Sequence, residues 1–319
     1  MYKQTFDSLQ EELWVTSVQV ATVWTSPQSA RDMDKLGLEN PTNIVQWVKT
    51  LSYHDKLALC DENRVQTQLL FGEYVLVREI KAGWARIVIP SQPSSKDDYG
   101  YPGWVPIVQL KKVMKADWQR EQTAVVKTKT AWLEEHSGNR IFSLSFLTAL
   151  PVIFDEEARI KVKTPEGSAF LLKSDVYIVN TRDGMKQRSG QAIALAATMF
   201  IGLEYFWGGM SSFGYDCSGL AYAAYKANGY QISRDASDQA IHGEAVPLDQ
   251  LQSGDLLFFA HNEGKGNVHH VGIYLGNGEM VHSPQTGKGI EITPLAGTLY
   301  EQELCVARRY WSTIEERRA

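Results

Sequence analysis

The sequence predicts an α+β protein in which two small β-barrels precede a third domain of mixed structure. Three observations lead to this prediction. Short β-rich runs separated by turn signals fill residues 17–179. A helical pattern begins at Ser189, and strands follow the helices, which is the order typical of α+β domains. We therefore divide the chain into residues 1–120, 121–184 and 185–319.

The first part combines short strands with one helical segment. Pro, Ser, Asp and Gly crowd into residues 90–102, which predicts an exposed loop between two strands. Residues 42–59 look helical, with Asn40-Pro41 as the start. This part is predicted to be a β-barrel with an inserted helix. Its expected strands are residues 18–23, 74–79, 84–88 and 104–108.

The second part repeats the order of strands seen in the first. The pairs Gly83-Trp84 and Gly103-Trp104, together with two successive barrels of short strands, resemble bacterial SH3-like domains. The resemblance implies two SH3-like β-barrels in tandem. The expected strands of the second barrel are residues 124–129, 147–154, 159–164 and 169–172.

The third part begins with Ser189 as the candidate N-cap of an apolar helix. A second apolar helix follows Cys217. Three strands come afterwards and complete the α+β pattern. They are predicted at residues 255–260, 268–275 and 279–283.

Composition excludes several classes of protein. The 319 residues carry 32 Lys plus Arg against 37 Asp plus Glu, a net charge of −5, which argues against binding to nucleic acid. Residues 192–202 are the most apolar helical stretch and fall short of the roughly 20 residues that a membrane span requires. The first thirty residues show no secretory signal pattern. We expect no membrane partner and a cytoplasmic location, or a secreted or cell-wall location if an upstream signal peptide was removed.

The three cysteines are too far apart for a disulfide framework or a CxxC zinc site, which favours a reducing compartment. Cys60 and Cys305 are interpreted as small hydrophobic residues. Cys217 differs because the segment Gly214-Tyr215-Asp216 leads directly into it and a helix follows. A helix N-terminus lowers the pKa of a thiol, which predicts a nucleophile. The alternative is a buried cysteine that begins a helix by chance.

Two histidines are expected to converge on this cysteine. Val271 and Ile273 alternate as one apolar face of a strand, which sends His270 to the other face, away from the packed side. Gly276-Asn277-Gly278 predicts a turn. A three-residue loop places His282 opposite Gly272 on the face of His270, whereas a two-residue loop separates the two histidines. The first register assembles a nucleophile, a base and an orienting residue.

The remaining histidines are weaker candidates. His269 is the obvious competitor for the role of base, but it shares the predicted apolar face with Val271 and Ile273, which argues against that role. His242 and His261 fall in polar segments and are expected to be solvated. A zinc site made of these histidines is the alternative, but no HExxH or CxxC spacing supports it, so we expect no metal and no cofactor.

The motifs of the third part occur in a familiar order. They closely resemble the motifs of NlpC-type, papain-like cysteine peptidases that cut bacterial cell-wall peptides. In chain order they are YFWGG, DCSG, Arg234-Asp235 with Gln239 behind it, SGDLLFF, HVGIYLG and MVHS. The two barrels resemble those of one branch, the γ-D-glutamyl-L-diamino acid endopeptidases of peptidoglycan recycling. The resemblance implies a papain-like catalytic domain over residues 185–319.

The resemblance also implies roles for individual residues. Cys217 is the nucleophile, His270 the base and His282 the residue that holds the base. The backbone N–H of Cys217 and the hydroxyl of Tyr205 form the oxyanion hole, although Tyr205 is equally compatible with a core position. The reaction is acyl transfer to the thiolate followed by hydrolysis, with no cofactor.

The implied substrate is L-Ala-γ-D-Glu-diamino acid with a free N-terminal amine, which buried acidic and hydroxyl groups would bind. Several candidates for substrate binding also have a purely structural interpretation. Asp216 is compatible with a helix cap, Arg234 and Asp235 with an ion pair on the surface, and Trp207 with a core position. Gln66 stands where we expect an acidic residue in relatives, and Glu73 is a conceivable substitute. The candidate substrate residues are Tyr101, which would reach over the cleft from the first barrel, and Asp216, Ser218, Arg234, Asp235 and Trp207.

Two alternatives compete with this interpretation. The first is a broader hydrolase that cuts intact peptidoglycan and uses the barrels as wall anchors. The second is a non-catalytic peptidoglycan-binding protein, which the intact Cys217, His270 and His282 argue against. Meso-diaminopimelate and L-Lys both remain open as the third residue of the stem peptide, as does the oligomeric state.

Overall fold

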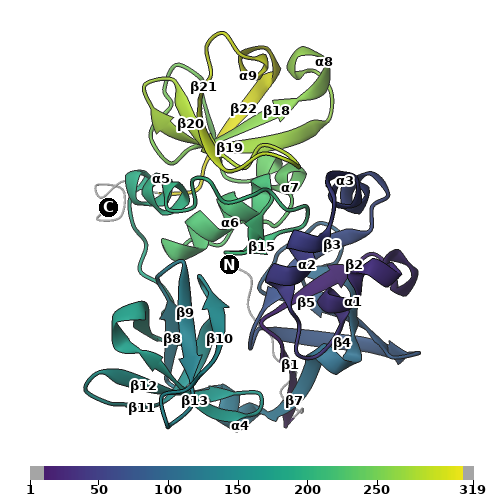
Figure 1. The fold of residues 1–319 in the computed structure, drawn as a ribbon. Coiled ribbons are helices and arrows are strands. Elements are labelled where there is room, and N and C mark those ends of the chain that lie inside the picture. The colour runs from purple at the N-terminus through teal and green to yellow at the C-terminus, as the bar shows by residue number, and fades with distance from the viewer. Residues whose placement is uncertain (1–10, 312–319) are drawn as a thin grey trace. The chain divides into compact units, whose positions relative to one another are not determined.

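The computed structural model describes residues 11–311 (Figure 1). The chain divides into two compact units, residues 1–184 and residues 185–319. Each unit is described by itself. Within the described residues, no helix has the length and apolar character needed to cross a bilayer.

The first unit begins with a seven-stranded antiparallel sheet. Its strand order is β3-β2-β6-β5-β4-β1-β7. The buried side chains of Val23, Leu69, Ile87 and Val105 belong to the core that this sheet encloses. Its strands are β1 (Glu12–Thr16), β2 (Val20–Trp24), β3 (Val65–Leu70), β4 (Tyr74–Lys81), β5 (Trp84–Ile89), β6 (Tyr101–Pro106) and β7 (Leu110–Met114).

The second sheet of this unit repeats the topology of the first. Its order, β10-β9-β13-β12-β11-β8-β14, is the first order with every number raised by seven. This repetition agrees with the predicted pair of similar barrels. Its strands are β8 (Gln122–Val126), β9 (Thr130–Glu134), β10 (Arg140–Ser145), β11 (Ala149–Asp155), β12 (Arg159–Thr164), β13 (Gly167–Leu172) and β14 (Val176–Asn180).

The segment inserted into the first barrel contains several helices rather than one. The helix predicted over residues 42–59 is interrupted at Leu51, whose backbone is extended. The Ser52 side chain accepts a hydrogen bond from the N–H of Asp55, and the Asp55 side chain accepts one from the Ser52 N–H, so a capping box starts a new helix there. The helices are α1 (Lys35–Leu38), α2 (Ile44–Thr50) and α3 (Tyr53–Asp61), and α4 (Lys115–Trp118) follows the barrel.

The two barrels pack against each other within the first unit. Phe71 follows β3 in the first barrel, yet it belongs to the buried core of the second. Its ring meets that of Phe142 edge to face, with 5.1 Å between the centroids. The Gln19 side chain donates a hydrogen bond of 2.5 Å to the carbonyl of Ser143. The barrels therefore form one compact unit with two sheets.

The second unit has the α+β architecture that the sequence predicts. Helices come first, and an antiparallel sheet of order β17-β22-β18-β19-β20-β21 follows. Its helices are α5 (Gly190–Thr198), α6 (Cys217–Ala227), α7 (Ala236–Ile241), α8 (His261–Gly264) and α9 (Leu299–Glu303). Its strands are β15 (Met210–Ser211) and β16 (Gly214–Tyr215), which pair with each other, and β17 (Glu244–Val246), β18 (Leu256–Ala260), β19 (Val268–Gly276), β20 (Glu279–His282), β21 (Glu291–Pro294) and β22 (Leu304–Arg309).

Both faces of this sheet are packed. The helices α5, α6 and α7 contact β19 (Figure 1). Phe258 pairs with Val271, and both are fully buried. The neighbouring positions Leu257 and Phe259 join a separate buried cluster with Met280. Because β19 lies between β18 and β20, its residues are held from both sides.

Candidate active site

The first component of the site is the N-terminus of α6. Asp216 is the N-cap, and its Oδ1 accepts a hydrogen bond of 2.6 Å from the N–H of Gly219. Cys217 is the first residue of the helix, as predicted. The backbone N–H groups of Ser218 and Val271 donate hydrogen bonds to its sulfur. The sulfur therefore lies beside β19, at the residue that follows His270.

Glycines allow the segments around Cys217 to approach closely. A Cβ at position 219 would collide with the carbonyl of Gly209. Gly209 in turn lies against the carbonyl of Gly214, within the hairpin of β15 and β16. The glycines of the YFWGG and DCSG motifs therefore let the approach segment pass directly beside the nucleophile helix.

The second component is a buried pair of histidines. Nε2 of His270 lies 2.7 Å from Nδ1 of His282. Nε2 of His282 lies 3.0 Å from Oγ1 of Thr293 on β21. If Nδ1 of His270 accepts a proton from Cys217, then Nε2 of His270 carries its hydrogen and donates it to His282. His282 then donates its own Nε2–H to Thr293, which makes a continuous chain of three residues.

The turn between β19 and β20 differs from the predicted three-residue loop. Gly276 pairs with Glu279, so the loop contains only Asn277 and Gly278. Both loop residues have positive φ, 54° and 77°, as a two-residue hairpin turn of this kind requires. The register shifts at Leu275, which forms a bulge next to the turn.

This bulge restores the register that a three-residue loop would produce. Ile273 pairs with Val281, so the next pair along the strands is Gly272 with His282. His282 therefore lies on the same face as His270, as predicted. A Cβ at position 272 would collide with the side chain of Met280 on β20 and would lie 3.5 Å from the Cβ of His282. Glycine at this position leaves room for both.

The prediction that His270 faces away from the packed side is wrong. Its ring lies between aromatic neighbours, with centroid distances of 5.8 Å to Phe259 and 5.5 Å to Tyr300. Tyr300, on α9, also meets the ring of His282 edge to face at 5.0 Å. Sequence reasoning missed both Tyr300 and Thr293, because neither belongs to a recognisable motif.

Burial shifts the pKa values of the central groups. It raises the pKa of the Cys217 thiol to about 12, and the negative charge of Asp216 adds to the shift. Burial lowers the pKa of His270 well below its ordinary value, and it lowers that of His282 to about 4. The prediction of a lowered thiol pKa is therefore wrong for this structure, because desolvation exceeds the effect of the helix N-terminus. Both shifts favour the uncharged forms of Cys217 and His270.

A buried polar network supports the start of α6. Nη1 and Nη2 of Arg234 donate to the two carboxylate oxygens of Asp216 at 3.1 and 2.7 Å. Nη1 also donates to Oγ of Ser218 at 2.8 Å, and Nε2 of Gln239 donates to the Ser218 carbonyl at 3.2 Å. Arg234 is only 1% exposed, so the alternative of a surface pair with Asp235 is wrong.

The structure places three further predicted residues in the second unit. Tyr205 is buried, donates its backbone N–H to the Lys288 carbonyl, and forms a bridge with Tyr215 next to the nucleophile helix. Trp207 is half-buried. Asp235 is the half-buried N-cap residue of α7, and its side chain makes no capping hydrogen bond with that helix.

Tyr101 belongs to β6 in the first unit. Its ring is buried, and its hydroxyl interacts with the ammonium of Lys96. Lys96 also donates to Oε1 of Gln66 at 3.0 Å and lies 4.3 Å from the centre of the Tyr101 ring. The carboxylate of Glu73 accepts hydrogen bonds from the Leu70 N–H and the Ser91 hydroxyl. A cation thus adjoins Tyr101, and the carboxylate of Glu73 is engaged within the barrel.

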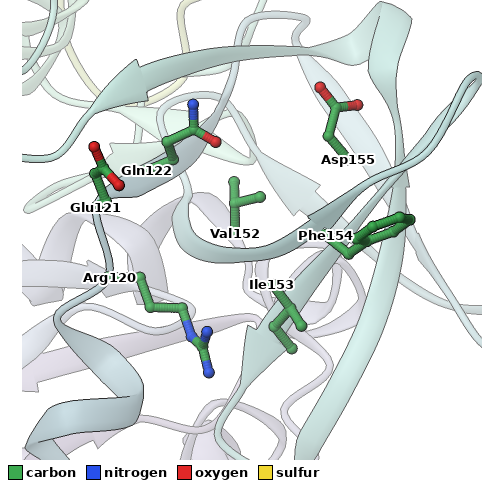
Figure 2. Close-up of a pocket in the computed structure, with 7 residues that line it drawn as sticks. All are labelled: Arg120, Glu121, Gln122, Val152, Ile153, Phe154 and Asp155. Atoms are coloured by element: carbon green, nitrogen blue, oxygen red, sulfur yellow. The ribbon is translucent and has the colours of Figure 1, made fainter.

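A surface pocket in the second barrel lies outside all of these groups. Figure 2 shows its lining by β8, β11 and the segment before β8. It contains none of the predicted site residues and neither a cysteine nor a histidine. Its lining residues are Arg120, Glu121, Gln122, Val152, Ile153, Phe154 and Asp155.

Comparison with known proteins places the chain in a family. The model of the NlpC/P60 family matches residues 202–309, and that of the YKFC SH3b2 domain matches residues 126–178. The chain is 46% identical over 293 residues to the gamma-D-glutamyl-L-lysine dipeptidyl-peptidase of Bacillus subtilis, with 92% of this chain and 97% of that protein covered. A protein of the same name from Bacillus cereus is 37% identical over 297 residues, with 92% and 89% covered.

A solved structure supports the same conclusion. The crystal structure of an NlpC/P60 family protein from Bacillus cereus superposes with a TM-score of 0.90 at 36% identity, and the match covers 94% of this chain and all of that one. This match spans both barrels and the domain that contains Cys217. The chain therefore belongs to the NlpC/P60 family and is a cysteine peptidase.

Proposed function

We propose that the protein hydrolyses the γ-D-glutamyl–diamino acid bond of peptidoglycan stem peptides that have a free N-terminal L-Ala. The observation that carries this proposal is the position of the Cys217 sulfur beside the N–H of Val271, the residue that follows His270 on β19. His270 in turn begins the buried chain that continues through His282 to Thr293. The names of the two relatives, which specify a γ-D-glutamyl bond and release of a dipeptide, support the substrate. The product is L-Ala-γ-D-Glu.

The reaction begins with an uncharged cysteine and histidine. As the Cys217 sulfur attacks the γ-carbonyl carbon, its proton passes to Nδ1 of His270. The imidazolium then donates this proton to the leaving amine of the diamino acid while the C–N bond breaks. Water attacks the resulting thioester, loses a proton to His270 and releases the dipeptide. The thiol takes back the proton, so no cofactor is consumed.

The surrounding residues orient the reacting groups. His282, held by Thr293, keeps the ring of His270 in the tautomer that accepts the proton. The backbone N–H of Cys217 and the hydroxyl of Tyr205 stabilise the oxyanion. Asp216, Arg234 and Ser218 act through their mutual hydrogen bonds, which hold the start of α6 in place.

The substrate amine requires an acidic partner, because an ammonium that leaves water must be compensated by charge and hydrogen bonds. We assign this role to Asp235, an acidic residue that is half-buried at the start of α7. Trp207, from the approach segment, supplies an apolar wall. Release of a dipeptide from a free N-terminus suits peptides that have already been detached from glycan, as in recycling.

Mass spectrometry of peptide digests tests this function. We expect L-Ala-γ-D-Glu from L-Ala-γ-D-Glu-L-Lys, no cleavage of the N-acetylated peptide, and no cleavage by Cys217→Ala. Cys60→Ala is the matched control and should retain activity. A parallel digest with meso-diaminopimelate as the third residue determines which diamino acid is accepted. If free and acetylated peptides are cleaved equally well, or if glycan-linked stems are also cleaved, the protein is instead a broader hydrolase of the cell wall.

A further inference from the structure

A second cluster of histidines lies next to the active site without belonging to it. His261, His269 and Glu303 form this group, which we call the His261 cluster. One potential ligand atom of each residue lies within 4.8 Å of the others. The residues come from the start of α8, from β19 and from the end of α9, so only the fold brings Glu303 to the two histidines.

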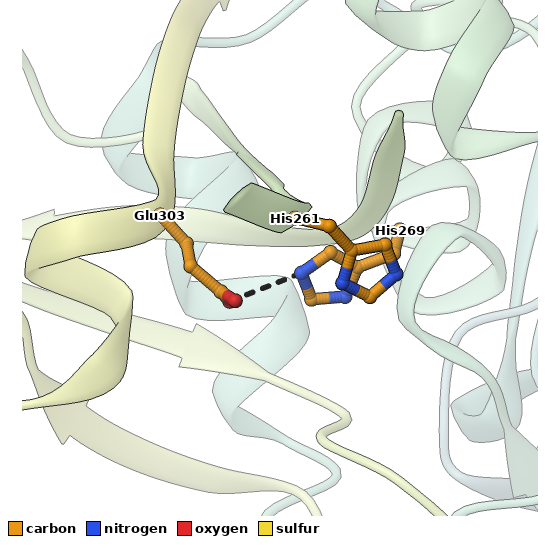
Figure 3. Close-up of side chains that lie close together, drawn as sticks. All are labelled: His261, His269 and Glu303. Atoms are coloured by element: carbon orange, nitrogen blue, oxygen red, sulfur yellow. Dashed lines mark hydrogen bonds and ion pairs between the residues drawn. The ribbon is translucent and has the colours of Figure 1, made fainter. Parts of the chain in front are cut away.

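The side chains of the cluster already face one another. The rings of His261 and His269 stack, with centroids 4.0 Å apart and an angle of 12° between their planes. Nε2 of His269 lies 3.0 Å from Oε2 of Glu303. Figure 3 shows the carboxylate at the edge of the two stacked rings. Both histidines are accessible from solvent, so an ion can reach their nitrogens.

The backbone around His261 is unusual in a way that supports this arrangement. Asn262 and Glu263 both have φ of 56°, a left-handed conformation that is costly for residues other than glycine. His261 directly precedes this turn and directly follows Ala260, the last residue of β18. The turn therefore redirects the chain immediately after the residue whose ring stacks on His269.

We infer that the His261 cluster binds a divalent transition-metal ion of the zinc class. Two imidazole nitrogens and one carboxylate oxygen suit Zn²⁺, whereas Mg²⁺ prefers a shell of oxygens. Bonds of about 2.0–2.1 Å place tetrahedral ligands about 3.4 Å apart, so the ligand atoms, now within 4.8 Å of one another, need to move closer. The two imidazole rings also need to turn away from their parallel stacking, because a metal ion binds in the plane of each ring. Water fills the remaining position. The cluster lacks the HExxH spacing, which is why the sequence pattern does not reveal it.

A bound ion would connect α9 to the catalytic histidines. Glu303 ends α9, and Tyr300, one turn earlier, packs on both His270 and His282. His269 precedes His270 on β19. A ligand bond to each of Glu303 and His269 would therefore hold Tyr300 against the histidine pair. The site would stabilise the arrangement of the active site and take no direct part in the chemistry.

Calorimetric titration of the full chain with Zn²⁺ tests this inference. The Cys217→Ala variant serves as the background, because Zn²⁺ also binds cysteine thiolates. We expect one ion per chain in this background and at least tenfold weaker binding when His261→Gln is added. His54→Gln, which changes an exposed histidine on α3, is the matched control and should not alter the affinity. Mg²⁺ should not bind.

Two further measurements make the outcome decisive. Co²⁺ should give the visible absorption of a four-coordinate nitrogen and oxygen site in the Cys217→Ala background, and Glu303→Gln should weaken that absorption. Zn²⁺ should raise the melting temperature of the background but not of its His261→Gln derivative. If the background binds no Zn²⁺, or binds it equally well after His261→Gln, the inference is overturned. Both outcomes are independent of peptidase activity and of the proposed function.

Discussion

The protonation state of Cys217 depends on two opposing effects. The N-terminus of α6 favours a thiolate, whereas burial and the charge of Asp216 favour the thiol and raise its pKa to about 12. Below the pKa, the thiolate fraction rises tenfold for each pH unit. We therefore expect the rate of alkylation of Cys217 by iodoacetamide to rise about tenfold per unit between about pH 7 and 9.

This experiment is clearest in a variant that lacks Cys60 and Cys305, because only Cys217 can then react. Mass spectrometry of the alkylated protein provides the rate at each pH. A rate that stays constant across this range would contradict the uncharged resting pair. It would show instead that the resting enzyme holds a thiolate beside an imidazolium.

Thr293 provides a second test at the level of single residues. Its hydroxyl is the partner of Nε2 of His282, a nitrogen deep in the site. Replacing Thr293 by Val leaves that nitrogen without this bond, which costs about 1 kcal/mol or more and permits the ring to turn. We expect kcat to fall about three- to tenfold with little change in KM.

Thr293→Ser is the matched control, because it retains the hydroxyl and should keep most of the activity. Steady-state kinetics on the L-Ala-γ-D-Glu-L-Lys peptide measures both variants. Equal kcat for Thr293→Val and the natural protein would remove Thr293 from the chain of hydrogen bonds that orients His270.

The sequence reveals the three central residues but not their immediate neighbours. Cys217, His270 and His282 stand in motifs with distinctive spacing, so their convergence could be predicted from strand periodicity and turn chemistry. Thr293 and Tyr300 reach the histidines because β21 is the neighbour of β20 and because α9 packs on the sheet. Those contacts depend on topology, which a local pattern does not encode.

At the level of elements, the hairpin of β19 and β20 differs from the prediction in its loop length but not in its register. His270 and His282 still lie on the same face. Asn277-Gly278 forms the two-residue turn that its chemistry favours. Taken alone, that turn would put His270 and His282 on opposite faces. The bulge at Leu275 adds the missing residue, and only the packing of both strands determines where it lies.

The inserted helices offer another comparison between sequence and structure. The helical pattern over residues 42–59 is real, but it ends at Leu51 and begins again after Ser52. The sequence Ser52-Tyr53-His54-Asp55 has the form of a capping box, so this restart could have been predicted. Asn43 caps α2 in a similar way, and it lies three residues after the predicted start at Asn40.

The start of α6 depends on the buried ion pair of Arg234 and Asp216, whose side chains are 1% and 8% exposed. Replacing Arg234 by Met leaves the carboxylate buried without its cation. We expect the second unit to lose about 3–5 kcal/mol of unfolding free energy. Urea denaturation monitored by far-ultraviolet circular dichroism measures this loss.

Lys265→Met is the matched control for this prediction, because the Lys265–Glu263 pair is 80% and 78% exposed. Removing this pair should change the unfolding free energy by less than about 1 kcal/mol. If both variants lie within 1 kcal/mol of the natural protein, the network beneath α6 does not stabilise the fold.

At the scale of the whole chain, the sequence pattern predicts the two β-sheets of the first unit but not all of their strands. Similar runs of β-branched residues predicted two barrels of the same order, and the identical strand orders agree. Several strands were nevertheless missed, among them β9 and β10. Buried and exposed positions alternate in β9, whereas the first four residues of β10 are exposed or half-buried. Pairing with neighbouring strands, rather than their own composition, defines such strands.

The division of the chain at Gly184 and Met185 leads to a final prediction. Each unit contains its own buried clusters: those of the two barrels in the first, and that of Leu257, Phe259 and Met280 in the second. A unit that buries a core of its own can fold without its neighbour. We expect residues 185–319, produced alone, to unfold cooperatively in scanning calorimetry and to retain a Cys217 that iodoacetamide alkylates slowly at neutral pH. A broad transition without a heat-absorption peak, or rapid alkylation at pH 7 like that of an exposed thiol, would mean that the second unit requires the first to maintain its active site.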